Sequence, residues 1–407
     1  MSDLRKSVLG LPHKKPSIGG SSKQTNFAPL KWHDYFDEEE FIQTDSGQHH
    51  IYIKGDKGPI ILCLHGGGYN GLTWSLFAKE IFQNIECQII ALDFRGHGNT
   101  KTINDTDLSL ETLTQDVVDV ANTLTEREKT SIVLIGHSMG GAIAVNASYK
   151  IDSLVGLCVI DVVEGTALDA LSSMQSILRG RPTHFNSLPE AIRWCYKGGQ
   201  CHNLTAARIS MPGQIINVKT GKLACDEWAD FDKIDSSSVL SNVNTNLKLS
   251  KFALAEIRED TSCVPSDKVT QKPPLPDRGN GGDGNLFKNP NVCSDTDDEE
   301  GNYTWRIDLS KTEPYWQHWF QGLSEKFLST RVPRVLLLAN ISGLDTKLTV
   351  GLMQGKFQMQ VLAKTGHAVH EDQPYQVAEI LSIYLVKQKC AETKPNFTMP
   401  LYPNTCC

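Results

Sequence analysis

The sequence of 407 residues predicts an α/β fold in which helices flank a mostly parallel central sheet. Three observations predict this fold. Apolar runs typical of buried strands alternate with helical patterns along most of the chain, as a parallel sheet covered on both faces requires. Several of these runs end at glycine-rich loops. One of them, LIGHSMGGAIAV from Leu134, passes from an apolar strand through Gly-Xaa-Ser-Xaa-Gly into a helix of small residues.

The composition excludes several classes of protein. Hydrophobic residues make up 40% of the chain and charged residues 21%, so the chain can bury a large core. The formal net charge of −7 argues against nucleic acid as the main partner. We expect neither a membrane span, which needs roughly 20 apolar residues, nor a signal peptide. The 11 scattered cysteines then indicate a reducing cytoplasmic or nuclear setting.

The first elements can be located from their polarity patterns. HHIYIKG, from His49, alternates in polarity, which indicates a strand. PIILCLHGGG, from Pro59, and CQIIALDFRGHG, from Cys87, are apolar runs that end in glycine-rich loops, as buried strands of a parallel sheet do. A helix with Ser109 as its N-cap follows. Its buried face is spaced by three and four residues, at Leu110, Leu113, Val117, Val120 and Leu124.

The alternation continues toward the C-terminus. The strand SIVLIG, from Ser131, precedes the helix from Met139, and the strand LVGLCVIDVV begins at Leu154. After an interruption, strands are expected in RVLLLAN and FQMQVLAKTGH, and a final helix from Gln376. Strands and helices in this order predict one continuous sheet.

The motif GHSMG fits a nucleophile elbow. In this turn between a strand and a helix, the serine, here Ser138, projects its hydroxyl from the carboxyl edge of the sheet. Neighbouring chain segments come so close that only glycine fits, which explains Gly136 and Gly140. The alternative is a turn serine that caps a helix.

Two further motifs favour catalysis over a simple cap. LHGGG ends an earlier strand, and its backbone N–H, at Gly67, together with that of Met139 would stabilise an oxyanion. TGHAVHED places His367 after the last strand, where a hydrolase has its base. These features together predict an α/β-hydrolase fold with a serine nucleophile.

The other histidines are expected to have structural roles. His65 would orient the oxyanion loop, and His97 would bond to backbone. His370 is an alternative base, but it lies beyond the loop. No Cys/His spacing suggests zinc, so we expect neither a catalytic metal nor a cofactor.

The acid of the triad has two candidates. Asp161 ends the apolar run CVID at the catalytic edge of the sheet, where an unpartnered carboxylate would be costly. Asp345 lies after the strand RVLLLAN, which is the usual position, but it is set among polar residues. Position alone leaves both open.

Longer stretches resemble the protein phosphatase methylesterase family of α/β-hydrolases. The likeness covers about residues 27–213 and 301–388 and includes LIGHSMGGAIAV, CVIDVVEGTALDALSSMQSILRGRP, YTWRIDLSKTEPYW, MQGKFQMQVL and GHAVHED. The resemblance implies a cofactor-free esterase that removes the methyl ester from the C-terminal leucine of the protein phosphatase 2A catalytic subunit. It implies Ser138 as nucleophile, His367 as base, and Asp161 rather than Asp345 as acid.

Composition and the strand–helix pattern divide the chain into parts. A flexible arm spans residues 1–30, and the hydrolase core spans 31–161 and 302–390. A helical lid spans 162–213, a polar insert 214–301, and a tail 391–407. The insert is acidic and poor in apolar residues, so we expect it to be disordered. The tail ends in Cys406 and Cys407, for which a double-cysteine prenylation signal is an alternative to a plain tail.

Two groups of residues are candidates for partner binding. In the lid, Arg179, Arg181, Trp194 and Arg208 would grip the incoming protein tail, or they are ordinary lid surface. In the insert, LAEIRE resembles a docking motif for regulatory subunits of the phosphatase, with Leu254 and Ile257 as anchors and Glu259 as the acidic group. Chance, or a helix turn docked on the enzyme itself, is the alternative.

Two other functions compete with the methylesterase. One is a broad carboxylesterase for small esters, which the triad residues alone do not exclude. The other is a phosphatase-binding inhibitory protein in which catalysis is secondary.

Overall fold

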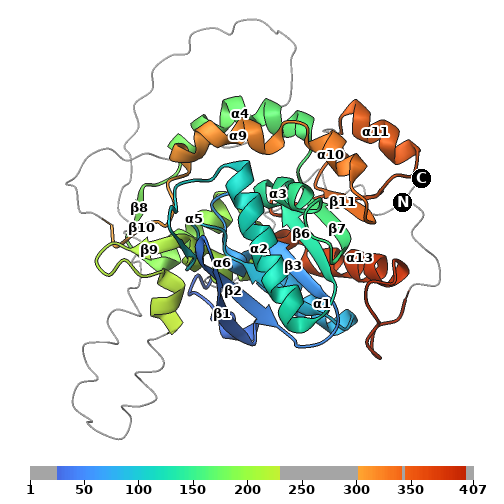
Figure 1. The fold of residues 1–407 in the computed structure, drawn as a ribbon. Coiled ribbons are helices and arrows are strands. Elements are labelled where there is room, and N and C mark those ends of the chain that lie inside the picture. The colour runs from blue at the N-terminus through green and yellow to red at the C-terminus, as the bar shows by residue number, and fades with distance from the viewer. Residues whose placement is uncertain (1–24, 230–300, 342–343, 400–407) are drawn as a thin grey trace, which may run out of the picture.

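A mostly parallel sheet forms the centre of the molecule, as the sequence predicts (Figure 1). The computed structural model describes residues 25–229, 301–341 and 344–399. Its nine-stranded sheet has the order β1-β2-β4-β3-β6-β7-β11-β12, with β5 beside β2. From β4 to β12 along this path, neighbouring strands pair in parallel, whereas β2 is antiparallel to β1, β4 and β5. The strands are β1 (Glu38–Thr44), β2 (Gly47–Lys54), β3 (Ile60–Leu64), β4 (Gln88–Leu92), β5 (Lys101–Thr102), β6 (Ile132–His137), β7 (Leu154–Ile160), β11 (Arg334–Leu338) and β12 (Gln358–Val361).

Both faces of the sheet are covered, which is why its central strands are continuous apolar runs. Every residue of β3, β4 and β6 is buried. Along β3, Leu62 packs into one hydrophobic core and Cys63 into the other, because successive side chains point to opposite faces. Helices α2 (Leu110–Glu128) and α3 (Met139–Ala147) contribute to the first core, and α1 (Ser75–Asn84) and α13 (Pro374–Lys387) to the second.

Local signals set the helix starts. Ser109 caps α2 by accepting a hydrogen bond from the Thr112 N–H, so the expected N-cap is confirmed. The predicted apolar face is buried along the helix. Short 3₁₀ helices η1 (Trp32–Asp34) and η2 (Gly71–Trp74) lead into β1 and α1.

A cap, here residues 164–229 and 301–320, lies over the carboxyl edge of the sheet. Figure 1 shows α4 and α9 side by side above the core, and the two helices are in contact. The cap contains α4 (Glu164–Arg179), β8 (His184–Phe185), α5 (Leu188–Lys197), α6 (Leu204–Ser210), η3 (Met211–Gln214), β9 (Ile215–Asn217), β10 (Tyr303–Trp305), η4 (Leu309–Thr312) and α9 (Glu313–Phe320).

The cap corrects one expected boundary. The sequence places residues 214–301 in a disordered insert, yet Ile215–Asn217 form β9 and the described structure continues to residue 229. Strand β9 pairs with β10, and β10 with β8, in a small antiparallel sheet. Such short strands show no periodic polarity pattern in the sequence. They form because β10 pairs with segments that precede it by many residues. Residues 230–300, with Leu254, Ile257 and Glu259, lie outside the described residues, as do 1–24 and Cys406 and Cys407.

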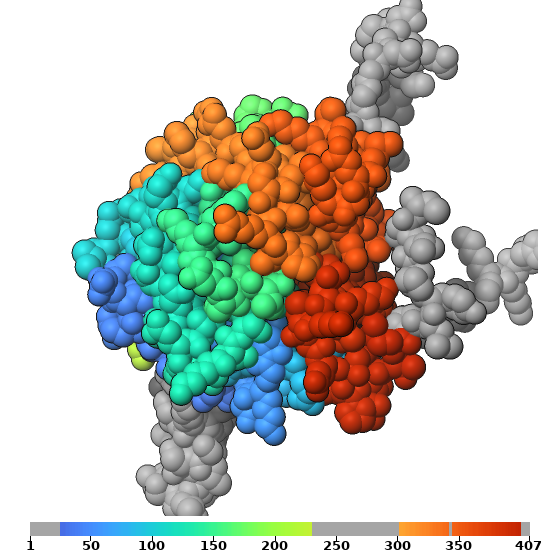
Figure 2. All heavy atoms as spheres, turned by 45° about the vertical axis from the view of Figure 1, so that its right-hand side comes forward, coloured from blue at the N-terminus to red at the C-terminus, as the bar shows by residue number. Residues whose placement is uncertain are grey.

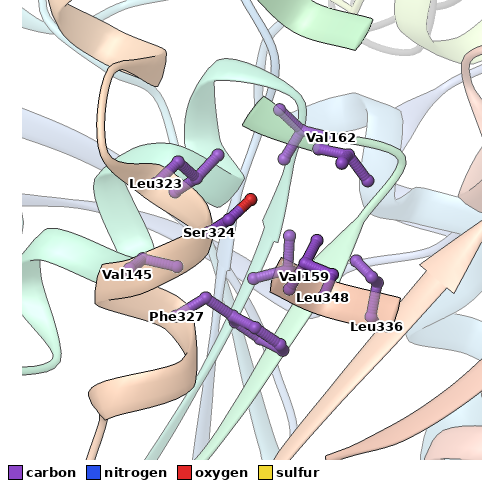
Figure 3. Close-up of a pocket in the computed structure, with 9 residues that line it drawn as sticks. Val145, Val159, Val162, Leu323, Ser324, Phe327, Leu336 and Leu348 are labelled. Carbon is purple, nitrogen blue, oxygen red and sulfur yellow. The ribbon is translucent and has the colours of Figure 1, made fainter. Parts of the chain in front are cut away.

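The segment after the gap completes the core. It contains α10 (Leu323–Ser329), β11, α11 (Thr346–Met353), β12, α12 (Val369–Asp372) and α13. In Figure 2 these residues, in orange and red, form one continuous surface with the blue and green first part. A small cavity remains beneath α10 and α11 against β7 and β11 (Figure 3). Its lining is apolar apart from Ser324, so it is a packing gap and not a candidate for chemistry.

Two features are absent from residues 25–229, 301–341 and 344–399 of the chain. No helix there is both long and apolar enough to cross a bilayer. No group of three or more His, Cys, Asp or Glu side chains there is arranged to hold a metal ion.

Candidate active site

Ser138 lies at the turn between β6 and α3 with φ 54° and ψ −121°. This left-handed conformation is unfavourable for a non-glycine residue and is typical of strained functional turns. The flanking glycines make the turn possible. A Cβ atom on Gly140 would lie 2.4 Å from the Leu64 carbonyl oxygen, and one on Gly136 would lie 2.2 Å from the Gly140 carbonyl oxygen. These contacts are with backbone, which cannot move aside, so close packing explains the glycines on either side of Ser138.

Two backbone N–H groups flank the serine. Met139 is the first residue of α3, where an N–H has no partner within the helix. Within the described residues, the N–H of Gly67 also makes no hydrogen bond, whereas the N–H of Gly68 donates to His97 Nε2 at 2.9 Å. A Cβ atom on Gly67 would be 3.8 Å from Met139 Sδ, so the two segments are neighbours. The two N–H groups that the sequence suggested are therefore unpaired within the described residues, on neighbouring segments.

Two buried histidines hold the loop that carries Gly67. His65 Nδ1 donates to the Gly66 carbonyl at 2.7 Å, and its Nε2 accepts from the Phe94 N–H at 3.0 Å. His97 Nδ1 donates to the Arg95 carbonyl at 2.9 Å while its Nε2 holds Gly68. Burial lowers the pKa of His65 to about 4 and that of His97 to about 3, so both are neutral. Their expected backbone-bonding roles are confirmed.

Asp161 and His367 form a hydrogen-bonded pair. His367 Nδ1 lies 2.7 Å from Asp161 Oδ2, and the Ala339 N–H donates to Asp161 Oδ1 at 2.9 Å. Burial alone would raise the pKa of Asp161, but the hydrogen bond and charge of His367 and the Ala339 N–H together lower it. Asp161 has φ 51°, so its backbone is strained as well. The carboxylate therefore stays ionised and orients the imidazole.

Asp345, the other candidate acid, lies elsewhere in the hydrogen-bond network. It is the N-cap of α11, where its Oδ1 accepts from the Leu348 N–H at 2.8 Å. Its Oδ2 accepts a hydrogen bond from the Ser324 hydroxyl. Both carboxylate oxygens are thus used to hold α11 against α10, and the structure does not bring Asp345 to His367.

The His367 side chain is 52% exposed, against 17% for Asp161. Within the described residues, no hydrogen bond joins its imidazole to the Ser138 hydroxyl. The two residues are nevertheless linked through His137, whose Nε2 donates to the His367 carbonyl at 2.8 Å and whose ring centroid is 4.7 Å from that of His367. Catalytic hydrogen bonds are often long without substrate and tighten in the complex.

His137 is a functional neighbour that sequence reasoning missed, because it occupies the variable position of the elbow motif. It is fully buried, and burial lowers its pKa well below the ordinary value. The sequence did contain a signal for this role, because a histidine at the end of a buried apolar strand requires a hydrogen-bond partner. The structure supplies that partner as the backbone of His367.

His370, the alternative base, is placed away from this chemistry. Its Nε2 lies 3.0 Å from the Thr73 hydroxyl, and its ring stacks on Trp74. It is fully buried, and burial lowers its pKa to about 3. Its environment is that of a core histidine.

Asp372 is a second residue that sequence reasoning missed. Its side chain is 2% exposed and accepts three hydrogen bonds: from the Gly366 N–H at 2.6 Å, the His202 N–H at 2.6 Å and His202 Nδ1 at 3.0 Å. Gly366 directly precedes His367, and His202 belongs to the cap. Asp372 thus ties the cap to the loop that carries the imidazole.

The four lid candidates have different environments. Arg208 Nε donates to the Ala28 carbonyl at 2.5 Å, which ties the N-terminal segment to α6. Arg179 is exposed at the end of α4 and reaches Gln175 at 3.4 Å. Trp194 packs in an aromatic cluster, and Arg181 lies over that cluster. The structure therefore gives Arg208 a structural partner and places Arg181 on the aromatic cluster of the cap.

The arrangement supplies the parts of acyl-transfer chemistry. A hydroxyl on a strained turn, an imidazole paired with a carboxylate, and two unpaired backbone N–H groups converge at the carboxyl edge of the sheet. The same constellation recurs on unrelated folds as a nucleophile, base and oxyanion site.

Comparisons with known proteins agree with this fold. Residues 61–217 match the model of the alpha/beta hydrolase family. Among solved structures, E-2-(acetamidomethylene)succinate hydrolase superimposes with a TM-score of 0.56 at 14% identity, covering 86% of this chain and 99% of that chain. An esterase of M. tuberculosis superimposes with a TM-score of 0.51 at 18% identity, covering 86% and 92%. At these identities the likeness shows the fold alone.

Sequence relatives are much more similar. The chain is 42% identical to protein phosphatase methylesterase 1 of Bos taurus, covering 96% of this chain and 98% of that protein. It is 41% identical to the protein of the same name in Homo sapiens, covering 96% and 97%. A probable protein phosphatase methylesterase 1 of Caenorhabditis elegans is 36% identical, covering 96% and 86%. Because such relatives align over nearly the whole chain, this protein belongs to the protein phosphatase methylesterase 1 family of alpha/beta hydrolases.

Proposed function

We propose that this protein is a serine carboxylesterase that demethylates the C-terminal leucine methyl ester of the protein phosphatase 2A catalytic subunit. The observation that carries the proposal is the Asp161–His367 pair, 2.7 Å apart, beside the strained turn of Ser138 in a member of this family. Its partners would be that catalytic subunit and regulatory subunits of the phosphatase, met in the cytoplasm or nucleus.

Acylation begins at Ser138. His367 Nε2 takes the hydroxyl proton as Oγ attacks the ester carbonyl, which requires the half-exposed imidazole to turn toward the serine. Asp161 holds Nδ1 protonated and stabilises the imidazolium that forms. The N–H groups of Gly67 and Met139 receive the oxyanion, and losing one such donor typically costs about 10²–10³ in rate.

Acylation is completed when His367 gives its proton to the departing methoxide, which leaves as methanol. In deacylation, a water molecule loses a proton to the same imidazole and attacks the acyl-enzyme carbonyl. His367 then returns this proton to Ser138 Oγ as the ester bond breaks, which frees the leucine carboxylate and restores Ser138. Every proton in the cycle passes through His367, so the chain's own residues suffice for these steps.

The test compares the wild-type chain with Ser138→Ala and a matched control, Ser148→Ala. Ser148 lies at the other end of α3, where its hydroxyl donates to the Val145 carbonyl at 2.7 Å. We expect wild type and Ser148→Ala to release methanol from a methylated phosphatase tail and to react with a fluorophosphonate probe. Ser138→Ala should lose both signals. Equal probe labelling of Ser138→Ala would refute the proposal.

Two further measurements separate the competing functions. Turnover of generic aryl esters that exceeds turnover of the methylated tail would indicate a broad carboxylesterase. Tight binding of the phosphatase by wild type and Ser138→Ala, without methanol release by the wild type, would indicate an inhibitory binding protein.

A further inference from the structure

Arg181 lies in the cap between α4 and β8, on a cluster of aromatic rings. Its guanidinium carbon is 3.7 Å from the centre of the Trp305 ring and 5.7 Å from that of Trp194. Phe185 packs against both rings, at 5.5 Å from Trp305 and 5.9 Å from Trp194. Trp305 is itself fixed because its indole N–H donates to the Pro182 carbonyl at 2.7 Å. The cluster holds the guanidinium in one orientation.

This guanidinium has no anionic partner among residues 25–229, 301–341 and 344–399. Within the described residues, no carboxylate forms an ion pair with Arg181 and its guanidinium makes no hydrogen bond. The buried Arg95, in contrast, makes two hydrogen bonds to Asp116, at 2.6 and 2.7 Å. Burial lowers the pKa of Arg181 to about 10, although the guanidinium remains charged at neutral pH. Arg181 is partly buried, and a partly desolvated cation without a counterion costs free energy, which an incoming anion would recover.

The stacking leaves the hydrogen-bonding groups of Arg181 available. A guanidinium that stacks on an aromatic ring uses its flat face, and its N–H groups point outward in the plane. Two of these N–H groups match the geometry of a carboxylate, which can accept both at once. The rigid aromatic support reduces the side-chain entropy that such binding would otherwise cost.

Arg181 is connected to the oxyanion loop from two sides. Its charge acts on the Tyr69 hydroxyl, and the Tyr69 ring is 5.5 Å from that of His137, next to Ser138. The strand that carries Trp305 leads to Leu309, whose side chain lies against Gly68. A Cβ atom built on Gly68 would be 2.6 Å from Leu309 Cδ1. The unpaired cation therefore lies on the cap side of the candidate active site.

We propose that Arg181 forms a subsite for a carboxylate of the peptide substrate, upstream of the reacting ester. This inference rests on the proposed esterase function and names the class of substrate. The reacting group is a neutral ester, so the carboxylate must belong to another residue of the peptide. The formal net charge of the chain is −7, which would repel an acidic peptide, so a local cation is needed to accept it.

The experiment uses pairs of short peptides that end in leucine methyl ester. Each pair differs by Asp or Asn at one position, from the second to the fifth residue before the end. The ratio of kcat/KM for the two peptides measures recognition of the charge. We expect wild type to prefer Asp by about tenfold or more at one position, as hydrogen bonds to a charged group allow. Arg181→Gln should remove this preference, and Arg181→Lys should keep part of it.

A matched control is Arg193→Gln, which removes an exposed cap arginine from α5 next to Trp194. It should retain the wild-type preference for Asp. A loss that is equal for both peptides in Arg181→Gln would mean a merely structural role and would overturn the proposal. No preference at any position in the wild-type enzyme would overturn it as well, and this outcome does not depend on whether the variants fold.

Failure of the proposed esterase function can be told apart from failure of the subsite. If the wild type hydrolyses none of the esters, the dissociation constants of the same peptides for the full chain are measured by fluorescence anisotropy. Tighter binding of the Asp peptide that Arg181→Gln abolishes would support the subsite without catalysis. Equal binding of Asp and Asn peptides would overturn it.

Discussion

At the scale of single residues, environment decides the role of each ionisable group. Asp161 and Asp345 are the same residue type and both follow strands of the sheet. Asp161 is bonded to the His367 imidazole, whereas Asp345 is bonded to the backbone of α11 and to Ser324. The Asp161 carboxylate therefore bonds to an imidazole, and the Asp345 carboxylate caps a helix.

This difference predicts opposite results for two matched substitutions. Asp161→Asn should lower kcat by about 10⁴-fold, because the amide no longer holds His367 in the required tautomer. Asp345→Asn should leave kcat within about threefold, since asparagine is also a good N-cap. Methanol release and thermal unfolding of both variants check this. Full activity in Asp161→Asn combined with loss in Asp345→Asn would reverse the assignment.

Glu371 gives a prediction for stability. Burial raises the pKa of this carboxyl to about 7, and its side chain is fully enclosed. Because its pKa is higher in the folded state than in the unfolded state, its contribution to stability is present at low pH and is lost as pH rises through about 7. In Glu371→Gln this loss is absent. The free energy of unfolding of the variant, relative to wild type, should rise by about 3 kcal/mol between pH 4.5 and 8.

Denaturant titrations of wild type and variant at several pH values measure this difference. Glu126→Gln, an exposed position on α2, is the control and should show no such trend. A relative stability of Glu371→Gln that stays flat with pH would show that the carboxyl is already ionised in the folded protein.

At the scale of elements, close backbone packing determines the geometry of the turn at Ser138. Strand β6 must pass directly into α3 while β3 and its loop lie alongside. Gly140 lies against the carbonyl groups of Leu64 and His65, at 2.4 and 2.5 Å from a Cβ atom placed on it. The turn therefore depends on the absence of one side-chain carbon.

Two Gly→Ala substitutions test this dependence. Gly140→Ala would force backbone atoms apart and should destabilise the fold by more than about 3 kcal/mol, or prevent soluble expression. Gly156→Ala, in the neighbouring β7, would place its Cβ atom 3.6 Å from Val133 side-chain carbons, which is an ordinary contact. Its melting temperature should stay within a few degrees of wild type. Similar melting temperatures for both variants would contradict the packing argument.

At the scale of the whole molecule, the cap and the core meet at the catalytic loop. Asp372 belongs to the core, yet it holds both the His202 backbone of the cap and the Gly366 N–H before His367. A Cβ atom on Gly366 would lie 2.8 Å from the His202 ring, so the contact is also tight. The position of the imidazole thus depends on where the cap lies.

Asp372→Ala should therefore lower kcat by about 10–100-fold, because the His367 loop loses its anchor and small misplacements are costly in catalysis. His202→Ala is the matched comparison, since it removes the ring but leaves its backbone N–H bonded to Asp372. Its effect on kcat should be smaller. Steady-state kinetics on the peptide ester check both, and a larger loss in His202→Ala than in Asp372→Ala would exclude Asp372 as the anchor.

Local patterns determined most elements of this protein. The spacing of apolar residues located α2, and continuous apolar runs located β3, β4 and β6, because burial on one or both faces leaves a repeat in the sequence. The glycines around Ser138 indicated the turn, because only close packing explains them. Such predictions succeed where the structural constraint acts between residues that are close together in the sequence.

Only the tertiary structure decided which distant groups meet. It brought Asp161 rather than Asp345 to His367. It joined His137 to the His367 carbonyl and Asp372 to the Gly366 N–H. It also paired β10 with β8 and β9, which lie before residues 230–300 in the sequence. The positions of these residues in the sequence could not decide the contacts, because each contact joins segments far apart in the chain, and only the family resemblance favoured Asp161 over Asp345. Their formation depends on the packing of whole elements, and the residues involved carry no periodic signal.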